Sequence, residues 1–284
     1  MQRFLKGWLP AVALALALAA ASAGAVSLEG RIGMAGSNYN LTEGKTEYAE
    51  RAVWTLGSVR AELPVGTTVH AHGQYQAGRT TKVEVTKGAP ASDQRGSLSR
   101  ITGGAELLWH PTSTFSLGVG LGYLSETQTH TWKAEHPDAA NSPVFSAGQT
   151  LDWTWNRTTT GLLFTAAVAL DTGAFELTGR VGYAPNLDWR ETTKAERDNL
   201  WEEWTPAAMK GSGGTYEMEG SLQLTSVLSL VAGVEGIVQQ SAKVASLAET
   251  YKNSAGDSEE HTVTDLPKAF DHRYAAFVGL RLRF

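Results

Sequence analysis

Residues 115–123 read FSLGVGLGY, a strict alternation of large apolar side chains with serine and glycine. Side chains of a β-strand point alternately to its two faces, so this stretch predicts a strand with one apolar face. The same period of two recurs in residues 69–77, 175–183 and 216–224. A repeated strand pattern of this kind indicates an all-β chain.

Period-two alternation occurs about ten times along the chain. The expected strands are 27–39, 50–63, 67–79, 96–110, 113–132, 149–170, 174–187, 214–225, 227–246 and 270–284. The tight turns between them are 62–66, 110–112, 171–173 and 225–227. The long polar links are 40–49, 80–95, 133–148, 188–213 and 247–269. Short and long links alternate, which predicts an antiparallel up-and-down β-barrel of about ten strands. Muddled alternation in the second and sixth strands indicates a bulge.

Alternation alone leaves open whether the apolar face lies inside a soluble β-sandwich or outside a membrane barrel. Aromatic residues near the short turns are Trp109, Phe115, Phe175 and Phe284, and those near the long links are Tyr75, Tyr123, Tyr183, Tyr216 and Tyr274. At ~3.3 Å per residue and a tilt of ~40°, the interval 115–123 spans ~20 Å along a membrane normal, close to the ~25 Å apolar band of outer-membrane barrels. The aromatic pattern therefore favours the membrane barrel.

The C-terminal residues continue the same pattern. One face carries Tyr274, Ala276, Val278, Leu280, Leu282 and Phe284. This strand is similar to the C-terminal signal of barrels inserted by the outer-membrane assembly machinery, so Tyr274 and Phe284 are candidate assembly-signal residues. We expect a barrel in the outer membrane of a Gram-negative-type bacterium, with short turns in the periplasm and long loops outside the cell. Expected partners are outer-membrane lipid, lipopolysaccharide and the assembly machinery, and a monomer is expected.

The first 25 residues have the order of a secretory signal peptide. Arg3 and Lys6 precede an apolar run from Trp8 to about Ala21, which ends in small residues. Cleavage after residue 23 or after residue 25 fits equally well. An uncleaved anchor is the alternative, but the run contains a proline and is shorter than the ~20 residues of a membrane span. The mature chain, 26–284, is expected to form a single barrel domain.

Composition excludes several classes of protein. The two basic residues of the signal leave 22 Lys and Arg against 29 Asp and Glu, a charge near −7 that argues against a nucleic-acid partner. The sequence contains no cysteine, so an exported fold of this chain needs a stabilisation other than disulfides. A closed hydrogen-bonded sheet provides it. No cofactor is expected.

Charged residues of both signs occupy the polar parity of the strands. They are Glu29, Arg31, Arg60, Glu62, His70, His72, Arg100, Glu106, Glu176, Arg180, Glu217, Glu219, Glu235, Arg281 and Arg283. Eight-stranded barrels are just filled by side chains, and ten strands enclose only a little more space. We therefore expect a packed ion-pair network in the lumen, with a narrow solute or ion path as the alternative.

Two sequence features raise the question of a metal. His70 and His72 share one face of a strand and could hold a metal with a nearby carboxylate. The acidic stretch 257–261 could meet a divalent cation, although it lacks the spacing of a calcium loop. In a charged lumen and a solvated loop the ordinary polar interpretation is favoured, so no metal site is predicted.

The longest link, 188–213, combines Trp189, Trp201 and Trp204 with several carboxylates. Aromatic and acidic side chains together can form a surface that binds a sugar, a peptide or a protein partner. These three tryptophans are the candidate ligand-binding rim. Extension of the strands and packing among the loops is the alternative explanation.

Ten strands, five long links, strands that run above the membrane and a polar interior resemble the omptin family of outer-membrane proteases. The most similar stretch is Phe175–Gly179 leading into Tyr183, followed by a long fourth loop. The resemblance covers the whole mature chain. It implies a proteolytic site made of an Asp pair in the second loop and an Asp–His pair in the fourth, with a water activated between them.

This sequence departs from the omptin pattern at those loops. The second loop has Asp93 as its only Asp, and the fourth has Asp188 and Asp198 but no His. His130, His136 and His261 belong to other loops. The favoured hypothesis is therefore a non-proteolytic omptin-like barrel with a surface-interaction or structural role. A narrow porin-like channel and a divergent surface protease are the alternatives.

Overall fold

The computed structural model describes residues 26–43, 46–65, 68–87, 92–136, 142, 144–206, 209–241, 244–252, 258–266 and 268–284. These residues form strands, turns and irregular segments. Among them, no helix is long and apolar enough to cross a membrane. The expected signal peptide, 1–25, lies outside the described residues, so its cleavage stays a prediction.

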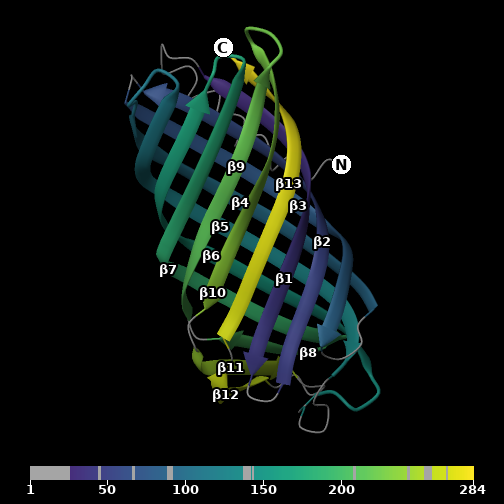
Figure 1. Cartoon of the computed structure of the whole chain (residues 1–284). Coiled ribbons are helices and arrows are strands. Elements are labelled where there is room, and N and C mark those ends of the chain that lie inside the picture. Colours follow the sequence, from purple (N-terminus) through teal and green to yellow (C-terminus); the bar gives the residue numbers. More distant parts are fainter. Residues whose placement is uncertain are drawn as a thin grey trace.

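Ten strands form one closed antiparallel barrel, which confirms the fold expected from the sequence (Figure 1). They are β1 (Ser27–Glu43), β2 (Thr46–Val65), β3 (Val69–Lys87), β4 (Ser92–Trp109), β5 (Phe115–Glu135), β6 (Thr150–Asp171), β7 (Phe175–Arg197), β9 (Met209–Gln223), β10 (Leu228–Ser241) and β13 (Lys268–Arg283). The first and last of them close the barrel, because β1 pairs with β13 from Ser27 opposite Arg283 to Thr42 opposite Lys268. Closure gives the backbone groups of every wall strand a partner on both sides.

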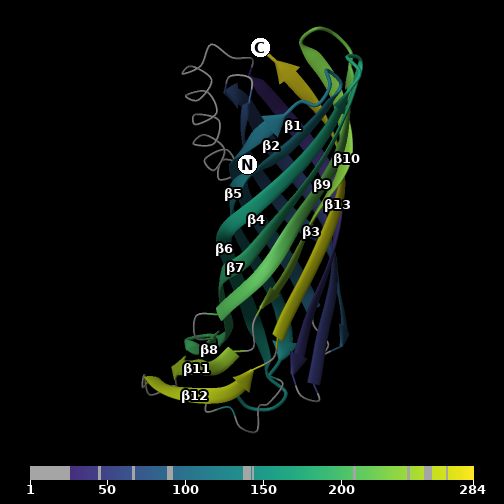
Figure 2. The ribbon, with the colours of Figure 1, turned by 60° about the vertical axis from the view of Figure 1, so that its left-hand side comes forward.

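Three further strands extend the sheet beyond one end of the barrel: β8 (Leu200–Pro206), β11 (Val244–Lys252) and β12 (Ser258–Leu266). They lie at the end opposite the C-terminus (Figures 1 and 2). β7 pairs with β8 over residues 193–197, β8 pairs with β11, and β11 pairs with β12. We call these three strands the extension sheet. The barrel end that carries it is the sheet end, and the opposite end, with the short turns, is the turn end.

The expected boundaries of the long links were wrong in four of five places. Residues 188–213 and 247–269 are largely strand, and β1 to β4 also continue far into the segments 40–49 and 80–95. In the expected link 133–148, only residues 133–135 of those that the structure describes are strand. Where both faces of a strand meet water, no apolar alternation marks it in the sequence. The hydrogen-bond ladder continues there without that signal.

Register shifts occur beside the second and sixth strands, but the extra residues lie in their neighbours. β3 carries the extra residue Thr81 opposite residues 53–54 of β2. β7 is irregular over residues 184–187 against both β6 and β9. Pro185 within this interval has no N–H to donate to a ladder, which suits a bulge position. The bulges were therefore predicted in the correct strand pairs and in the wrong strands.

The outer surface of the barrel is apolar. Large hydrophobic side chains with 36 to 72% exposure lie on the wall strands, and Ile32, Val119 and Leu162 are each more than 60% exposed. A soluble protein buries such side chains, and a continuous exposed belt of them is typical of a surface that contacts lipid. Trp109 and Phe284 are exposed at the turn end, and Tyr123, Tyr183 and Tyr274 are exposed on the far side of the belt.

Inward-facing glycines let adjacent strands approach closely. A Cβ atom at Gly120 of β5 would collide with the backbone of Ala105 and Glu106 on β4. The alternation of residues 115–123 therefore has a packing reason on both faces: the apolar side chains face outward, and the small ones leave room inside the wall. The space they leave is occupied by long charged side chains.

Candidate functional site

The turn half of the lumen is a cluster of buried arginines and glutamates. Arg31 Nη1 and Arg60 Nη1 both donate to one oxygen of Glu217, each at 2.6 Å. Arg281 Nε donates to Glu29 at 2.8 Å. The three arginine side chains are at most 4% exposed. A buried charge is tolerated only when it is paired and hydrogen-bonded, so these contacts are a condition of burial.

The middle of the lumen continues this network. Arg180 forms a two-pronged contact with Glu106, with Nε at 2.8 Å and Nη2 at 3.2 Å from the two carboxylate oxygens. Gln74 and Gln76 donate to the two oxygens of Glu235. These residues come from β3, β4, β7 and β10, so side chains from several parts of the wall meet across the interior.

The sheet half of the lumen holds a second group of ion pairs. Arg100 Nε donates to Glu126 at 2.9 Å, and Arg273 contacts both Glu126 and Asp271. Arg157 also pairs with Asp271 and is fully buried. The ion-pair network expected from the sequence is therefore present, and it extends through both halves of the barrel.

The cavity of the turn half is larger than those found beside Trp54 in the sheet half. A cavity of about 280 Å³ occupies the turn half, and a neighbouring one measures about 60 Å³; Arg60, Arg180 and Glu217 line both. Further along, two cavities of about 10 Å³ and 50 Å³ are lined by Trp54. One water needs about 10–15 Å³, so the smaller of these two cavities, lined by Trp54 and Arg273, has room for about one water.

An aromatic cluster encloses Arg157 at the sheet end. Its guanidinium carbon lies 4.8 Å from the ring centroid of Trp189, 5.3 Å from Trp155 and 5.6 Å from Tyr39. Glu191 accepts hydrogen bonds from the Trp155 indole at 2.6 Å, the Trp189 indole at 3.0 Å and the Tyr39 hydroxyl at 3.0 Å. The polar tips of the three aromatic residues each have a partner, whereas Nε and Nη1 of Arg157 are buried with no hydrogen-bond partner among the described residues and face the aromatic rings.

A second aromatic group lies where β5 and β6 meet the extension sheet. Trp153 stacks on Trp132 at 5.9 Å and on Trp204 at 5.6 Å between ring centroids, with interplanar angles of 6° and 10°. His136 packs beside Trp153 at 5.7 Å, and its Nε2 lies 2.9 Å from Glu202 Oε2. The Glu202 side chain is fully buried, so this histidine–carboxylate pair fixes the packing of the extension.

The structure does not bring the three tryptophans of the expected rim together. Trp189 is fully buried in the lumen, and Trp204 stacks under the extension sheet. Trp201 is partly exposed, and the Nζ of Lys194 lies 5.9 Å from its ring centroid. Trp189 faces inward because the irregularity over residues 184–187 of β7 changes which alternate residues face the lumen, and the sequence predicted that this strand ends at residue 187. A ligand role for Trp201 or Trp204 stays a prediction.

The aspartates of the fourth link lie on the outer surface. Asp188 is paired with Lys210, and the hydrogen bond from this lysine lowers the pKa of its carboxyl. Asp198 occupies a tight turn with φ of 59° and is 87% exposed. Asp93 is exposed as well. Exposed aspartates of this kind are typical of a solvated surface.

The histidines named from the sequence have different surroundings. His130 is buried between Trp54 and Trp155, with ring centroids 5.3 Å and 5.2 Å away. The side chain of His261 and residue 257 lie outside the described residues. His130 is therefore separated by the barrel wall from the exposed Asp188.

The two candidate assembly-signal residues face outward on the last strand. Tyr274 is 52% exposed and Phe284 is 72% exposed. The backbone of Phe284 pairs with Val26, so the last residue is joined to the first described one. Their exposure leaves both rings accessible, and recognition by the assembly machinery stays a prediction.

Several lumen residues escaped the sequence analysis, above all Glu126, Arg157, Asp271 and Arg273. They lie on the same parity as the inner residues nearer the turn end, and following that parity along β5, β6 and β13 would have found them. The strands that carry them were predicted, but inward-facing residues were named only for the part of each strand that lies within the apolar belt.

Comparisons with known proteins support the fold. No family model matches the chain, and no curated protein matches it. Among solved structures, the outer membrane protease OmpT from Escherichia coli has 10% sequence identity and a TM-score of 0.66, over 92% of this chain and 97% of that chain. The translocator domain of the autotransporter NalP from Neisseria meningitidis has 16% identity and a TM-score of 0.44, over 93% of this chain and 89% of that chain. The likeness to OmpT shows that the chain has the fold of an outer-membrane β-barrel.

Proposed function

We propose that this protein is a closed, non-conducting outer-membrane barrel that carries its extension sheet outside the cell as an interaction surface. The observation that supports it best is the filled lumen, in which buried ion pairs and the aromatic cluster around Arg157 leave room for about one water at the narrowest level. A barrel closed in this way has no path for solutes. The surface that remains available for interactions is therefore the part outside the membrane.

The exposed apolar belt supports the membrane location. A membrane-spanning strand needs about 9–11 residues, whereas β7 has 23 and β6 has 22. The excess lies on the sheet end, where β8, β11 and β12 continue the wall. Outer-membrane barrels have short turns in the periplasm and long segments outside the cell, so the extension sheet is assigned to the cell surface.

A labelling experiment tests this orientation. The chain contains no cysteine, so Asp198→Cys at the β7–β8 turn and Ser226→Cys at a short turn each provide one thiol. With a membrane-impermeant maleimide, intact cells should label the first variant, and the second should react only after the outer membrane is opened. The reverse pattern, or recovery of the protein as a soluble periplasmic species, would overturn the proposal.

Conductance in planar bilayers tests the closed lumen. Reconstituted protein should give little or no conductance, because the arginine–carboxylate pairs at Arg157 and Arg273 and the neighbouring Trp54 fill the cross-section. A porin inserted under the same conditions is the positive control. Steady, large conductance steps from this protein would favour the narrow-channel alternative.

A surface protease is the second candidate, because the OmpT-like fold and the His136–Glu202 pair both point to it. The surroundings of this pair argue against a hydrolytic role. Ser142 donates to Glu202 and not to the histidine, and its hydroxyl accepts backbone N–H groups of Val144 and Phe145. Protein refolded with lipopolysaccharide should leave peptides with paired basic residues intact. Cleavage that is lost in His136→Ala would establish the protease instead.

A further inference from the structure

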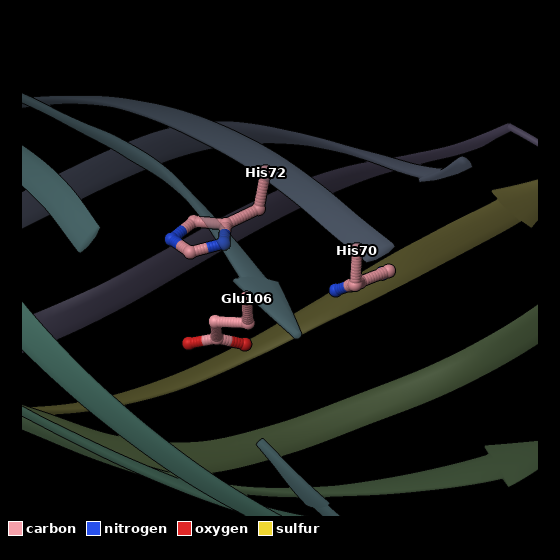
Figure 3. Close-up of side chains that lie close together, drawn as sticks. All are labelled: His70, His72 and Glu106. Atoms are coloured by element: carbon pink, nitrogen blue, oxygen red, sulfur yellow. The ribbon is translucent and has the colours of Figure 1, made fainter. Parts of the chain in front are cut away.

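His70 and His72 lie on β3 beside Glu106 of β4, on the inner wall of the turn half (Figure 3). The strand register places His70 directly opposite Glu106, and His72 follows two residues along on the same face. One ligand atom from each of the three side chains lies within 4.8 Å of the others. The sequence placed the two imidazoles together, but only the pairing of β3 with β4 adds the carboxylate.

Two imidazoles and one carboxylate form a ligand set that suits zinc. In a tetrahedral site with metal–ligand distances of ~2.1 Å, ligand atoms stand ~3.4 Å apart, so small side-chain rotations are enough to close this cluster around an ion. Imidazole nitrogen favours zinc and its transition-metal neighbours over magnesium or calcium. Three protein ligands also leave one tetrahedral position for a water.

The ring of His72 has an unused polar atom. Its Nδ1 is buried and has no hydrogen-bond partner among the described residues. A buried polar atom without a partner is unfavourable, and a bound ion at this nitrogen would remove that penalty. The orphaned atom is an observation independent of the spacing of the three side chains.

The surroundings of the cluster support a bound cation. Arg180 holds both oxygens of Glu106, at 2.8 Å and 3.2 Å, and such a contact orients a ligating carboxylate from outside the metal site. Glu62 lies 3.9 Å from His70. His70 and Glu106 line the cavity of about 280 Å³, whose lining contains six carboxylates and three arginines. This excess of negative charge favours a divalent ion.

We propose that His70, His72 and Glu106 form a zinc site that is loaded from the turn end of the barrel. The cavity that reaches His70 and Glu106 is also lined by His110 and by residues 113–116 of the β4–β5 turn. In the proposed orientation this turn faces the periplasm. The site joins β3 to β4, so a bound ion adds a cross-strand link to the wall.

Zinc titration of the whole protein tests the site. Protein made without a histidine tag is stripped with EDTA, refolded in detergent and titrated with ZnCl₂ by calorimetry; Co²⁺ replaces Zn²⁺ in a parallel titration, so that visible absorption reports the coordination. We expect one ion per chain, a tetrahedral Co²⁺ spectrum, and affinity at least tenfold weaker in His72→Ala. His70→Ala should behave in the same way.

The control is His272→Ala, which removes a partly buried histidine on the outer face of β13, one whose Nε2 lies 3.3 Å from the Tyr216 hydroxyl. Its zinc affinity should equal that of the unchanged protein. A folded barrel is verified for every variant by its heat-modifiable migration on gels. Absence of zinc binding, or equal binding by folded His70→Ala and His72→Ala variants, would overturn the proposal, and neither outcome bears on the closed lumen.

Discussion

The two halves of the lumen are filled with the same kinds of side chain but differ in their access to water. In the turn half, Arg180 borders cavities of about 280 Å³ and 60 Å³. In the sheet half, the side chain of Arg157 packs against aromatic rings and is fully shielded from solvent. Water can hydrate a charge left unpaired beside a cavity, whereas a charge in a dry site has no such substitute. The same ion pair should therefore matter more in the sheet half.

The largest effect is expected for Arg157→Ala. It removes one of the two arginines that pair with the buried carboxylate of Asp271, leaving Arg273, and it empties the aromatic cluster, so it should lower the free energy of unfolding by about 3–5 kcal/mol. Urea unfolding in lipid vesicles, followed by tryptophan fluorescence, measures this loss. A loss below about 1 kcal/mol would mean that the sheet half is hydrated and would remove the distinction between the halves.

A smaller effect is expected for Arg180→Ala in the turn half. Its partner Glu106 borders the large cavity, where water can take over the lost hydrogen bonds, so the loss should be about 1–3 kcal/mol. The same unfolding measurement applies. A loss as large as that of Arg157→Ala would show that the cavity does not hydrate the carboxylate.

Trp204→Ala tests the packing of the extension sheet against the barrel. Loss of the stack on Trp153 should remove about 0.5–1.5 kcal/mol beyond the loss of buried area, and the effect should be confined to the extension. Limited proteolysis on intact cells should then cut the extension sheet faster, while the heat-modifiable migration of the barrel stays unchanged. Loss of barrel migration would show that the extension is required for the wall itself.

The smallest effect is expected for Arg283→Ala. This arginine donates to Glu176 at 2.7 Å, but its side chain is 39% exposed at the turn end. Exposed ion pairs contribute little, so the free energy of unfolding should change by less than about 1 kcal/mol. The unfolding curve should nearly overlay that of the unchanged protein. A loss comparable to that of Arg157→Ala would extend the dry part of the lumen to the turn end.

The apolar belt was the part of the fold that the sequence predicted best. Residues such as Val119 and Val181 are exposed because the outer face meets lipid, and their strict alternation with small or polar residues makes each strand visible. The strand pairs that form the barrel follow from the alternation of short and long links. Beyond the belt this signal ends, and β8, β11 and β12 escaped prediction for that reason.

The candidate sites were predicted less completely. His70 and His72 share a face by the two-residue period of a strand, so the sequence places them together. Glu106 joins them only through the register of β3 against β4. Trp189 was expected at the rim because the strand that carries it was predicted to end at residue 187, and it is buried because the irregularity of β7 over residues 184–187 turns it into the lumen.

The sequence by itself determined the all-β class, the barrel order, the apolar outer face and the charged inner face, because all four follow from side-chain period and link length along the chain. Only the tertiary structure decided which inner charges meet, where the lumen closes and how the extension sheet pairs. Those contacts join residues as distant in the chain as Arg157 and Asp271, or Glu29 and Arg281. They depend on strand register and barrel closure, which bring distant inner positions together and leave no local periodic trace in the sequence.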